Sequence, residues 1–165
     1  MKTEFQAIIP APFGVIGVKT EADYLTGLAL LLEPNTKLLS ATDAFTQEVV
    51  AQINTYLTNA KHIFNLPVAL DGTPFQKRVW AAIQQVKAGE LLTYSELAIA
   101  ANSGPRAVAN ACGANHLLLV IPCHRIVAKN GLGGFGGQGL SSCEANLNVK
   151  RWLLNHEKSN PEKAL

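Results

Sequence analysis

The first part of the chain carries short apolar runs separated by polar or turn-forming stretches, which is the pattern of a small meander of strands. Three apolar segments have this character, at residues 4–9, 14–19 and 25–32. The turn-forming stretch Pro10-Ala11-Pro12 separates the first two, and the three together predict a β-meander. After Thr42 and Asp43, either of which can cap a helix, apolar residues recur with helical spacing through Leu57. Residues 1–70 are therefore predicted to form a small α/β domain.

The turn signal Asp71-Gly72 marks the predicted domain boundary, and helical periodicity dominates after it. Thr73-Pro74 predicts a helix start, because proline is favoured at the first helical position. Gly89 is expected to end that helix. Residues 71–165 are thus predicted to form a second, mainly helical domain.

Two further short helices follow, and the turn between them gives the pair a helix-turn-helix signature. The stretch Thr93-Tyr94-Ser95-Glu96 fits a capping box for the first helix, and the second runs over about residues 105–112. Asn102-Ser103-Gly104 supplies the turn. Arg106 then lies in the first turn of the second helix, the part that reaches the duplex in DNA-binding proteins of this type. The same pattern also fits an ordinary αα-hairpin with a solvated arginine.

Composition and charge narrow the function classes. The 165 residues are 48% hydrophobic and 16% charged, which suits a globular chain, and no apolar run is long enough to span a membrane. The net charge of +2 is divided unevenly, because residues 1–70 carry four Lys/Arg against six Asp/Glu and residues 71–165 carry ten against six. The basic second part favours a polyanionic partner. Three cysteines without a C-x-x-C pair are typical of a reducing cytoplasm and predict no zinc site.

The candidate chemistry of the chain lies at Cys123, in the run Ile121-Pro122-Cys123-His124-Arg125-Ile126-Val127. Only a thiolate is a strong nucleophile, and a neighbouring imidazole or cation is what produces thiolate at neutral pH. An inert core cysteine beside a surface His and Arg is the other interpretation of this run alone. If residues 119–127 are extended, Cys123 and His124 point to opposite faces, so that a bridging water would carry the proton. A carboxylate would then orient the imidazole, and Glu157 is a candidate.

Six glycines between residues 131 and 139 form a second unusual feature. At this density the backbone can approach a ligand and offer its amides, although a flexible linker has the same composition. The pattern Ser141-x-x-Glu144 is expected to cap a final helix in which Ala145 faces inward and Lys150 and Arg151 face outward.

Taken together, these segments resemble the O6-alkylguanine-DNA alkyltransferases. The similarity covers about residues 71–158, with the segments in the same order and mostly at the same spacing. It is carried by Gly72-Thr73-Pro74-Phe75-Gln76, Val79-Trp80, Thr93-Tyr94-Ser95-Glu96-Leu97-Ala98, Arg106-Ala107-Val108, Asn115, Ile121-Pro122-Cys123-His124-Arg125-Ile126-Val127 and Lys150-x-Trp152-Leu153-Leu154-x-His156-Glu157. The Pro-Cys-His-Arg signature is highly specific, and it favours the reactive cysteine over the inert one.

The resemblance implies a protein that flips O6-methylguanine, and also O4-methylthymine, out of duplex DNA and moves the alkyl group irreversibly to its own cysteine. Its catalytic residues would be Cys123 as acceptor, His124 as water-relayed base, Glu157 as the carboxylate that orients it, Asn115 as hinge and Tyr94 beneath the flipped nucleotide. Its DNA-binding residues would be Arg106, which fills the vacated space, with Tyr94, Ser95 and Ala107. Its base pocket would be lined by Ile126, Phe135 and Gly136.

The same resemblance implies an α+β fold, with a small ribonuclease-H-like scaffold domain over residues 1–70. A mainly helical, winged-helix-like domain over residues 71–165 would bind DNA and transfer the alkyl group. The expected protein is a methylated-DNA–protein-cysteine methyltransferase that works once, without cofactor, metal or membrane, as a cytoplasmic monomer on double-stranded DNA containing O6-alkylguanine. Two features depart from the family pattern: Phe135 stands where many relatives have tyrosine, and the stretch between Gly139 and Lys150 is longer by several residues.

Two other function classes fit the residues taken alone. A helix-turn-helix DNA-binding or regulatory module without chemistry predicts binding that survives Cys123→Ala and no alkyl transfer. A cysteine hydrolase predicts turnover of ester substrates, although the chain lacks the expected downstream histidine with a separate orienting asparagine.

Overall fold

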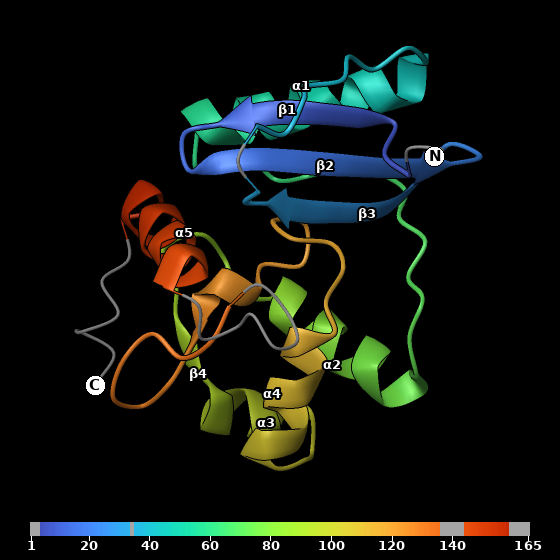
Figure 1. Cartoon of the computed structure of the whole chain (residues 1–165). Helices are drawn as coiled ribbons and strands as arrows, with labels where there is room; N and C mark the ends of the chain where they lie inside the picture. Colours follow the sequence, from blue (N-terminus) through green and yellow to red (C-terminus); the bar gives the residue numbers. More distant parts are fainter. Residues whose placement is uncertain (1–3, 34, 136–143, 159–165) are drawn as a thin grey trace. The chain divides into compact units, whose positions relative to one another are not determined.

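The computed structural model describes residues 4–33, 35–135 and 144–158. The chain divides into two compact units, residues 1–70 with 116–118 and residues 71–115 with 119–165, and Figure 1 labels most of the elements of both. The sequence did not predict that segment 116–118 belongs to the first unit. The combination of a small sheet with helices confirms the predicted α+β class.

The first unit is built on a three-stranded antiparallel sheet in the order β1-β2-β3. Its strands are β1 (Ala7–Ala11), β2 (Gly14–Glu21) and β3 (Tyr24–Leu31), so the predicted meander is confirmed with slightly shifted bounds. Segment 116–118 pairs with the edge of β3, because the Leu28 N–H donates to the His116 carbonyl at 2.9 Å and the Leu118 N–H donates to the Leu28 carbonyl at 3.4 Å. These bonds satisfy main-chain groups that an open edge would leave free to pair with another strand.

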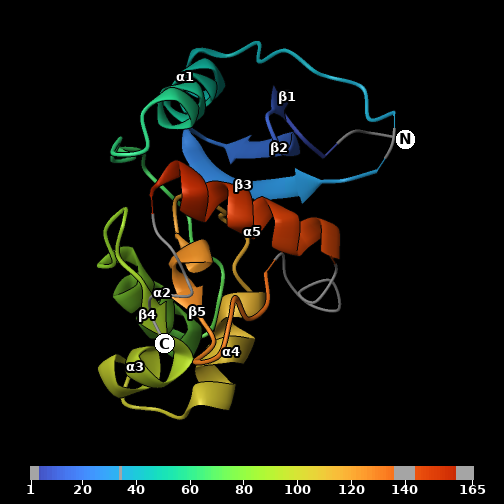
Figure 2. The same ribbon diagram turned by 90° about the vertical axis from the view of Figure 1, so that its left-hand side faces the viewer.

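Helix α1 (Ala44–Thr58) lies across one face of this sheet, as Figures 1 and 2 show. Asp43 caps it as predicted, since its carboxylate accepts the Thr46 N–H at 2.9 Å. Ile53 is fully buried on the inner face. Thr46 is also buried, and its hydroxyl lies 2.6 Å from that of Thr20 on β2, so that a polar pair joins the helix to the sheet.

Helix α2 (Pro74–Gln84) begins the second unit with a complete capping box. The Thr73 hydroxyl accepts the Gln76 N–H at 3.1 Å, and the Gln76 side chain accepts the Thr73 N–H at 2.9 Å. The expected helix end at Gly89 is wrong. The helix stops at Gln84, where the backbone tightens into i to i+3 hydrogen bonds, and Gly89 takes φ +90° in the turn that follows.

Helices α3 (Tyr94–Ala100) and α4 (Pro105–Gly113) confirm the predicted helix-turn-helix. The capping box of α3 is present, and Asn102 takes a left-handed conformation, with φ 54°, in the turn. Helix α2 packs against both, and its fully buried Trp80 donates its indole N–H to the Ala111 carbonyl at 2.8 Å. Figure 2 shows the three helices beside the short strands β4 (Leu92–Thr93) and β5 (Ile126–Val127), which pair in parallel.

A 3-10 turn, η1 (Cys123–Arg125), leads directly into β5, and helix α5 (Glu144–His156) packs against this turn. The predicted orientation of α5 is wrong for two residues, because Ala145 is exposed and Lys150 is fully buried, whereas Arg151 is exposed as expected. Within the described ranges, no helix has the length and apolarity needed to cross a membrane.

Candidate active site

Cys123 stands at the start of η1, in a backbone that turns rather than extends. The expected extended conformation over residues 119–127 is wrong: the Arg125 N–H donates back to the Pro122 carbonyl at 3.0 Å, and Leu119 has φ 72°. The proline cannot donate to a sheet ladder, and the i to i+3 bonds wind the next three residues into one turn. The directions of the Cys123 and His124 side chains are therefore set by this turn, not by strand alternation.

The Cys123 sulfur is buried, with 8% of the residue exposed, and polar groups surround it. The Asn115 amide donates to Sγ at 3.1 Å and to the Ile121 carbonyl at 2.9 Å, so it holds the sulfur in a fixed position relative to this backbone. Sγ also lies 3.8 Å from the carbonyl oxygen of Cys112. The hydrogen bond from the Cys112 thiol lowers the pKa of Cys123 against the effect of burial, and the Asn115 amide and the Lys150 ammonium add to this lowering. The site thus favours the thiolate.

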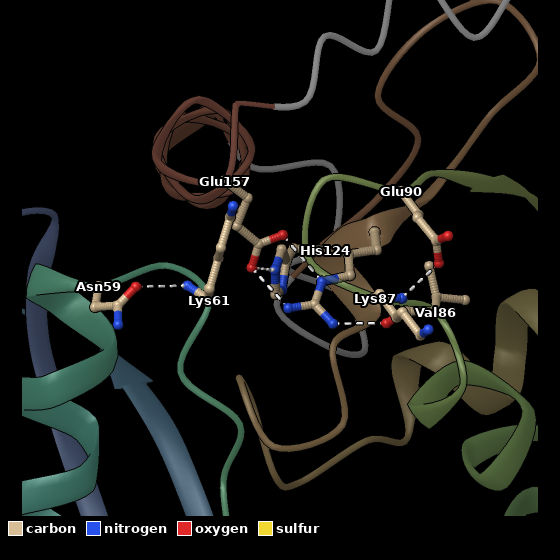
Figure 3. Close-up of polar contacts among 8 residues, drawn as sticks. Asn59, Lys61, Val86, Lys87, Glu90, His124 and Glu157 are labelled. Atoms are coloured by element: carbon tan, nitrogen blue, oxygen red, sulfur yellow. Dashed lines mark hydrogen bonds and ion pairs between the residues drawn. The ribbon is translucent and has the colours of Figure 1, made fainter.

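His124 is 1% exposed and faces Glu157, as Figure 3 shows. Its Nε2 lies 2.8 Å from Oε2 of Glu157, while Nδ1 is buried without a hydrogen-bond partner among the described residues. Burial lowers the pKa of His124, and the Glu157 carboxylate only partly opposes this effect. The imidazole is therefore neutral at pH 7, with its proton on Nε2 donated to the carboxylate and the Nδ1 lone pair available to accept a proton.

Sequence analysis assigned no separate role to Arg125, yet the structure places it at the centre of the same cluster. Its Nε donates to Oε1 of Glu157 and its Nη2 to Oε2, both at 2.9 Å. Its Nη1 donates to the Val86 carbonyl at 2.6 Å. The available signal was the position of an arginine directly before the buried pair Ile126 and Val127, since a charge in an apolar run requires a partner.

Lys150 is the second residue that sequence reasoning missed. Its ammonium donates to the carbonyls of Ile126 at 2.6 Å, Leu132 at 2.5 Å and Gly134 at 2.9 Å. Burial lowers its pKa to about 8. Three carbonyl acceptors match the three N–H bonds of an ammonium and compensate its burial. The lysine therefore joins the glycine-rich segment to β5, and helical periodicity carried no signal for it.

Tyr94 lies against the glycine-rich segment, and two further residues expected to hold a base, Phe135 and Ile126, are buried. A Cβ at Gly133, which has φ +74°, would lie 2.7 Å from the Tyr94 ring, so that only glycine allows this approach. Burial raises the pKa of Tyr94 to about 12, which keeps its phenol protonated and able to donate. Phe135 is 5% exposed and Ile126 is fully buried, while Gly136 lies outside the described residues.

The residues expected to contact DNA lie on the helix-turn-helix. Arg106 is exposed in the first turn of α4, and Ala107 beside it is half-buried. Ser95 is exposed in the first turn of α3. The Arg78 guanidinium donates through Nε to the Ala101 carbonyl at 3.1 Å, so α2 supports the end of α3 directly before the turn. Helix α2 thus supports the helix pair, and Ser95 and Arg106 on that pair are exposed.

Comparisons with known proteins agree with this arrangement. Residues 74–159 match the model of the DNA-binding domain of 6-O-methylguanine DNA methyltransferase. The methylated-DNA–protein-cysteine methyltransferase of Haemophilus influenzae is 33% identical over 96% of this chain and 88% of its own length. A probable methylated-DNA–protein-cysteine methyltransferase of Acanthamoeba polyphaga mimivirus is 46% identical over 59% of this chain, and the match spans 62% of that protein.

Solved structures give the same result over nearly the whole chain. The crystal structure of the Mycobacterium tuberculosis O6-methylguanine methyltransferase superposes with a TM-score of 0.75 at 30% identity, covering 92% of this chain and 90% of that one. The matched family model alone covers more than half of the chain. This protein is a member of the 6-O-methylguanine DNA methyltransferase family.

Proposed function

We propose that this protein repairs duplex DNA by direct reversal, transferring the methyl group of O6-methylguanine to Cys123. The observation that carries the proposal is the buried thiol with a lowered pKa, in the same 3-10 turn as a neutral imidazole whose Nδ1 is unpartnered among the described residues. A binding module without chemistry has no need for either feature. Family membership supports the same conclusion.

The reaction is a displacement at the methyl carbon. The Cys123 thiol passes its proton through a water molecule to Nδ1 of His124, and Glu157 holds the other nitrogen. The thiolate then attacks the carbon, the bond from carbon to O6 breaks, and its electron pair remains on the guanine. Asn115 holds the sulfur in the position of attack. Because Tyr94 is protonated, its phenol can donate a hydrogen bond to the departing base and stabilise the negative charge that develops there.

The O6 atom lies within the base stack, so the nucleotide must leave the duplex before the sulfur can reach it. We propose that Arg106 enters the vacated space, with Ser95 and Ala107 against the backbone, since these residues lie in the first turns of α3 and α4. Ile126, Phe135 and Gly136 would enclose the flipped base. The positive charge of residues 71–165 is modest, so affinity should be moderate and should fall with salt.

The product is a thioether, which has no carbonyl for water to attack, so the protein acts once. We propose that residues 71–165 hold the DNA-binding and alkyl-transfer functions, that residues 1–70 serve as a scaffold, and that one monomer acts on one lesion. A thiol that must remain reduced suits a reducing compartment such as the cytoplasm. A transfer assay with duplexes that carry O4-methylthymine or a larger O6-alkyl group measures whether the protein also repairs these lesions.

The test is a transfer assay with a duplex that carries one O6-methylguanine. We expect mass spectrometry to find one methyl group on the peptide with Cys123, a restored guanine in the DNA, and no second turnover. Cys123→Ala should bind the duplex without transfer, and Cys143→Ala serves as the matched cysteine control, which should still accept the methyl group. An unmodified Cys123 with unchanged DNA would refute the proposal, and binding without transfer would favour the helix-turn-helix module.

A further inference from the structure

Arg125 is the member of the Pro-Cys-His-Arg signature to which the proposed reaction gives no task. It is 9% exposed, and Nε, Nη1 and Nη2 each donate a hydrogen bond. Two of these bonds end on Glu157, whose side chain is fully buried. A charged side chain buried in this way is costly unless it is paired, so its retention beside the reacting residues requires an explanation.

We propose that Arg125 is a positioning residue that keeps Nδ1 of His124 free of a proton, so that this nitrogen can serve as the base. The inference rests on the proposed alkyl transfer for its catalytic meaning, although the state of the imidazole can be measured without it. Arg125 does not touch the reacting atoms; it acts through Glu157.

The charge of Glu157 depends on its pairing with Arg125. A fully buried carboxyl group without a cation tends to take up a proton, because burial disfavours the charged form. The guanidinium contacts both oxygens, Oε1 through Nε and Oε2 through Nη2, in the bidentate geometry that suits a carboxylate. Glu157 therefore remains ionised and acts only as an acceptor, so the proton in the bond to His124 must come from Nε2.

Removing the Arg125 guanidinium would change the protonation of its neighbours. The pair formed by His124 and Glu157 would then take up a proton more readily, and that proton has two places to go. If it binds the imidazole, both ring nitrogens are protonated. If it binds Glu157, the carboxylic acid donates to Nε2 and the ring proton moves to Nδ1. In both cases Nδ1 carries a hydrogen and can no longer accept one from the thiol.

The guanidinium is also held in place from its other side. Nη1 is fixed on the Val86 carbonyl, which belongs to the turn after α2. This turn is closed by Glu90, whose carboxylate accepts the Lys87 N–H at 2.8 Å and whose N–H donates to the Lys87 carbonyl at 2.9 Å, as Figure 3 shows in part. Gly89, with φ +90°, brings the turn close to the backbone of Glu157, since a Cβ there would lie 3.5 Å from the Glu157 carbonyl. The turn after α2 therefore binds Arg125 through Val86 and lies against the backbone of Glu157, the ion-pair partner of Arg125.

The charged groups around His124 all affect whether its imidazole is protonated. Glu157, just beyond α5, favours the imidazolium, whereas Arg125 on η1 and Lys150 on α5 oppose it. The Cys123 thiolate is the remaining ionisable group beside the imidazole in the turn. Of the two cations, only Arg125 contacts the carboxylate that sets the tautomer, and Lys150 is bound to backbone carbonyls. The two cations therefore have separable effects.

The test replaces Arg125 by methionine and by glutamine, with Arg125→Lys as the conservative variant and Arg151→Met as the control that removes an exposed arginine from α5. Two quantities are measured on the full chain: the pH dependence of the single-turnover methyl-transfer rate, and the protonation of His124 by ¹⁵N NMR in the protein without DNA. Both neutral variants should shift the acidic limb of the rate profile upward by about 1 pH unit or more. They should also show a proton on Nδ1 near neutral pH, while Arg125→Lys should largely restore the wild-type tautomer and Arg151→Met should change neither quantity.

A rate that falls equally at every pH, with the wild-type tautomer retained in both neutral variants, would overturn the inference. If Arg125→Met fails to fold, Arg125→Gln decides alone, because it keeps a hydrogen-bond donor and lacks the charge. If the wild-type protein transfers no methyl group, the proposed function fails, and the NMR titration still decides the role of Arg125.

Discussion

Replacing the buried Trp80 by phenylalanine is expected to destabilise the second unit by about 1.5–2.5 kcal/mol. The indole N–H donates to the Ala111 carbonyl at 2.8 Å, and the side chain is fully buried. Loss of the indole donor removes one hydrogen bond to this carbonyl, which still accepts the Ala114 N–H at 3.2 Å, so the loss costs about 0.5–1.5 kcal/mol. The smaller ring adds about 1 kcal/mol for the cavity that remains.

A second substitution tests whether this account of the packing is right. A Cβ at Gly72 would lie 2.6 Å from Cη2 and 2.7 Å from Cζ3 of Trp80, so Gly72→Ala alone should cost about 1–3 kcal/mol through overpacking. Both atoms belong to the part of the indole that phenylalanine lacks. In the double variant the new methyl group occupies vacated space, and the loss should be smaller than the sum of the single losses by about 1 kcal/mol or more. Compensation stays partial because the Cβ also meets the flexible Gln76 side chain at 2.9 Å.

The measurement is the free energy of unfolding in urea, followed by far-ultraviolet circular dichroism, for the wild type, both single variants and the double variant. Trp152→Phe on α5 is the control, because this tryptophan is half-buried and should not couple to Gly72→Ala. If the losses from Gly72→Ala and Trp80→Phe add to within about 0.5 kcal/mol, the contact inferred between the two positions is refuted.

Three further predictions concern the site. Cys112→Ala should raise the pKa of Cys123, because it removes a thiol hydrogen bond, and the pH profile of iodoacetamide alkylation should move to higher pH; an unmoved profile contradicts this role. The pKa of Lys150 is lowered from 10.5 to about 8, so the unfolded chain binds this proton more tightly and the free energy of unfolding should rise between these pH values. That rise, at most about 1.4 kcal/mol per pH unit, should be absent from urea titrations of Lys150→Met. Arg106→Ala should weaken binding to duplex DNA and lessen the salt dependence of that binding, as measured by fluorescence anisotropy. If the variant and the wild type bind with equal affinity at every salt concentration, Arg106 does not contact the DNA.

The helices of the second unit could be predicted because their signals are local. A capping box joins residues three apart, so Thr73 and Glu96 indicate where helices begin without knowledge of the rest of the fold. The same locality explains the error at Gly89: glycine commonly ends helices, but the end of α2 at Gln84 carries no residue that marks it.

The interior of the site could be predicted only in part. Sequence analysis named Glu157 as a candidate to orient His124, and the structure brings their side chains to 2.8 Å. Sequence spacing could not place the two together, and the family resemblance supplied the assignment. The burial of Lys150 could not be predicted, because its three acceptors are main-chain carbonyls near Ile126 and in the glycine-rich segment. An amphipathic pattern assigns a lysine to solvent, and only the tertiary structure supplies partners that reverse this.

Segment 116–118 has a consequence for how the protein can be made and divided. A ribosome completes all of β3 long before it reaches His116, so the edge of this strand at Leu28 stays unpaired until the whole helix-turn-helix has been synthesised. For the same reason a fragment that ends at Leu70 would leave the main chain of Leu28 unpaired and prone to associate with other strands. Two fragments made by cutting after Leu70 should reconstitute the first unit only when the second fragment donates residues 116–118 in trans.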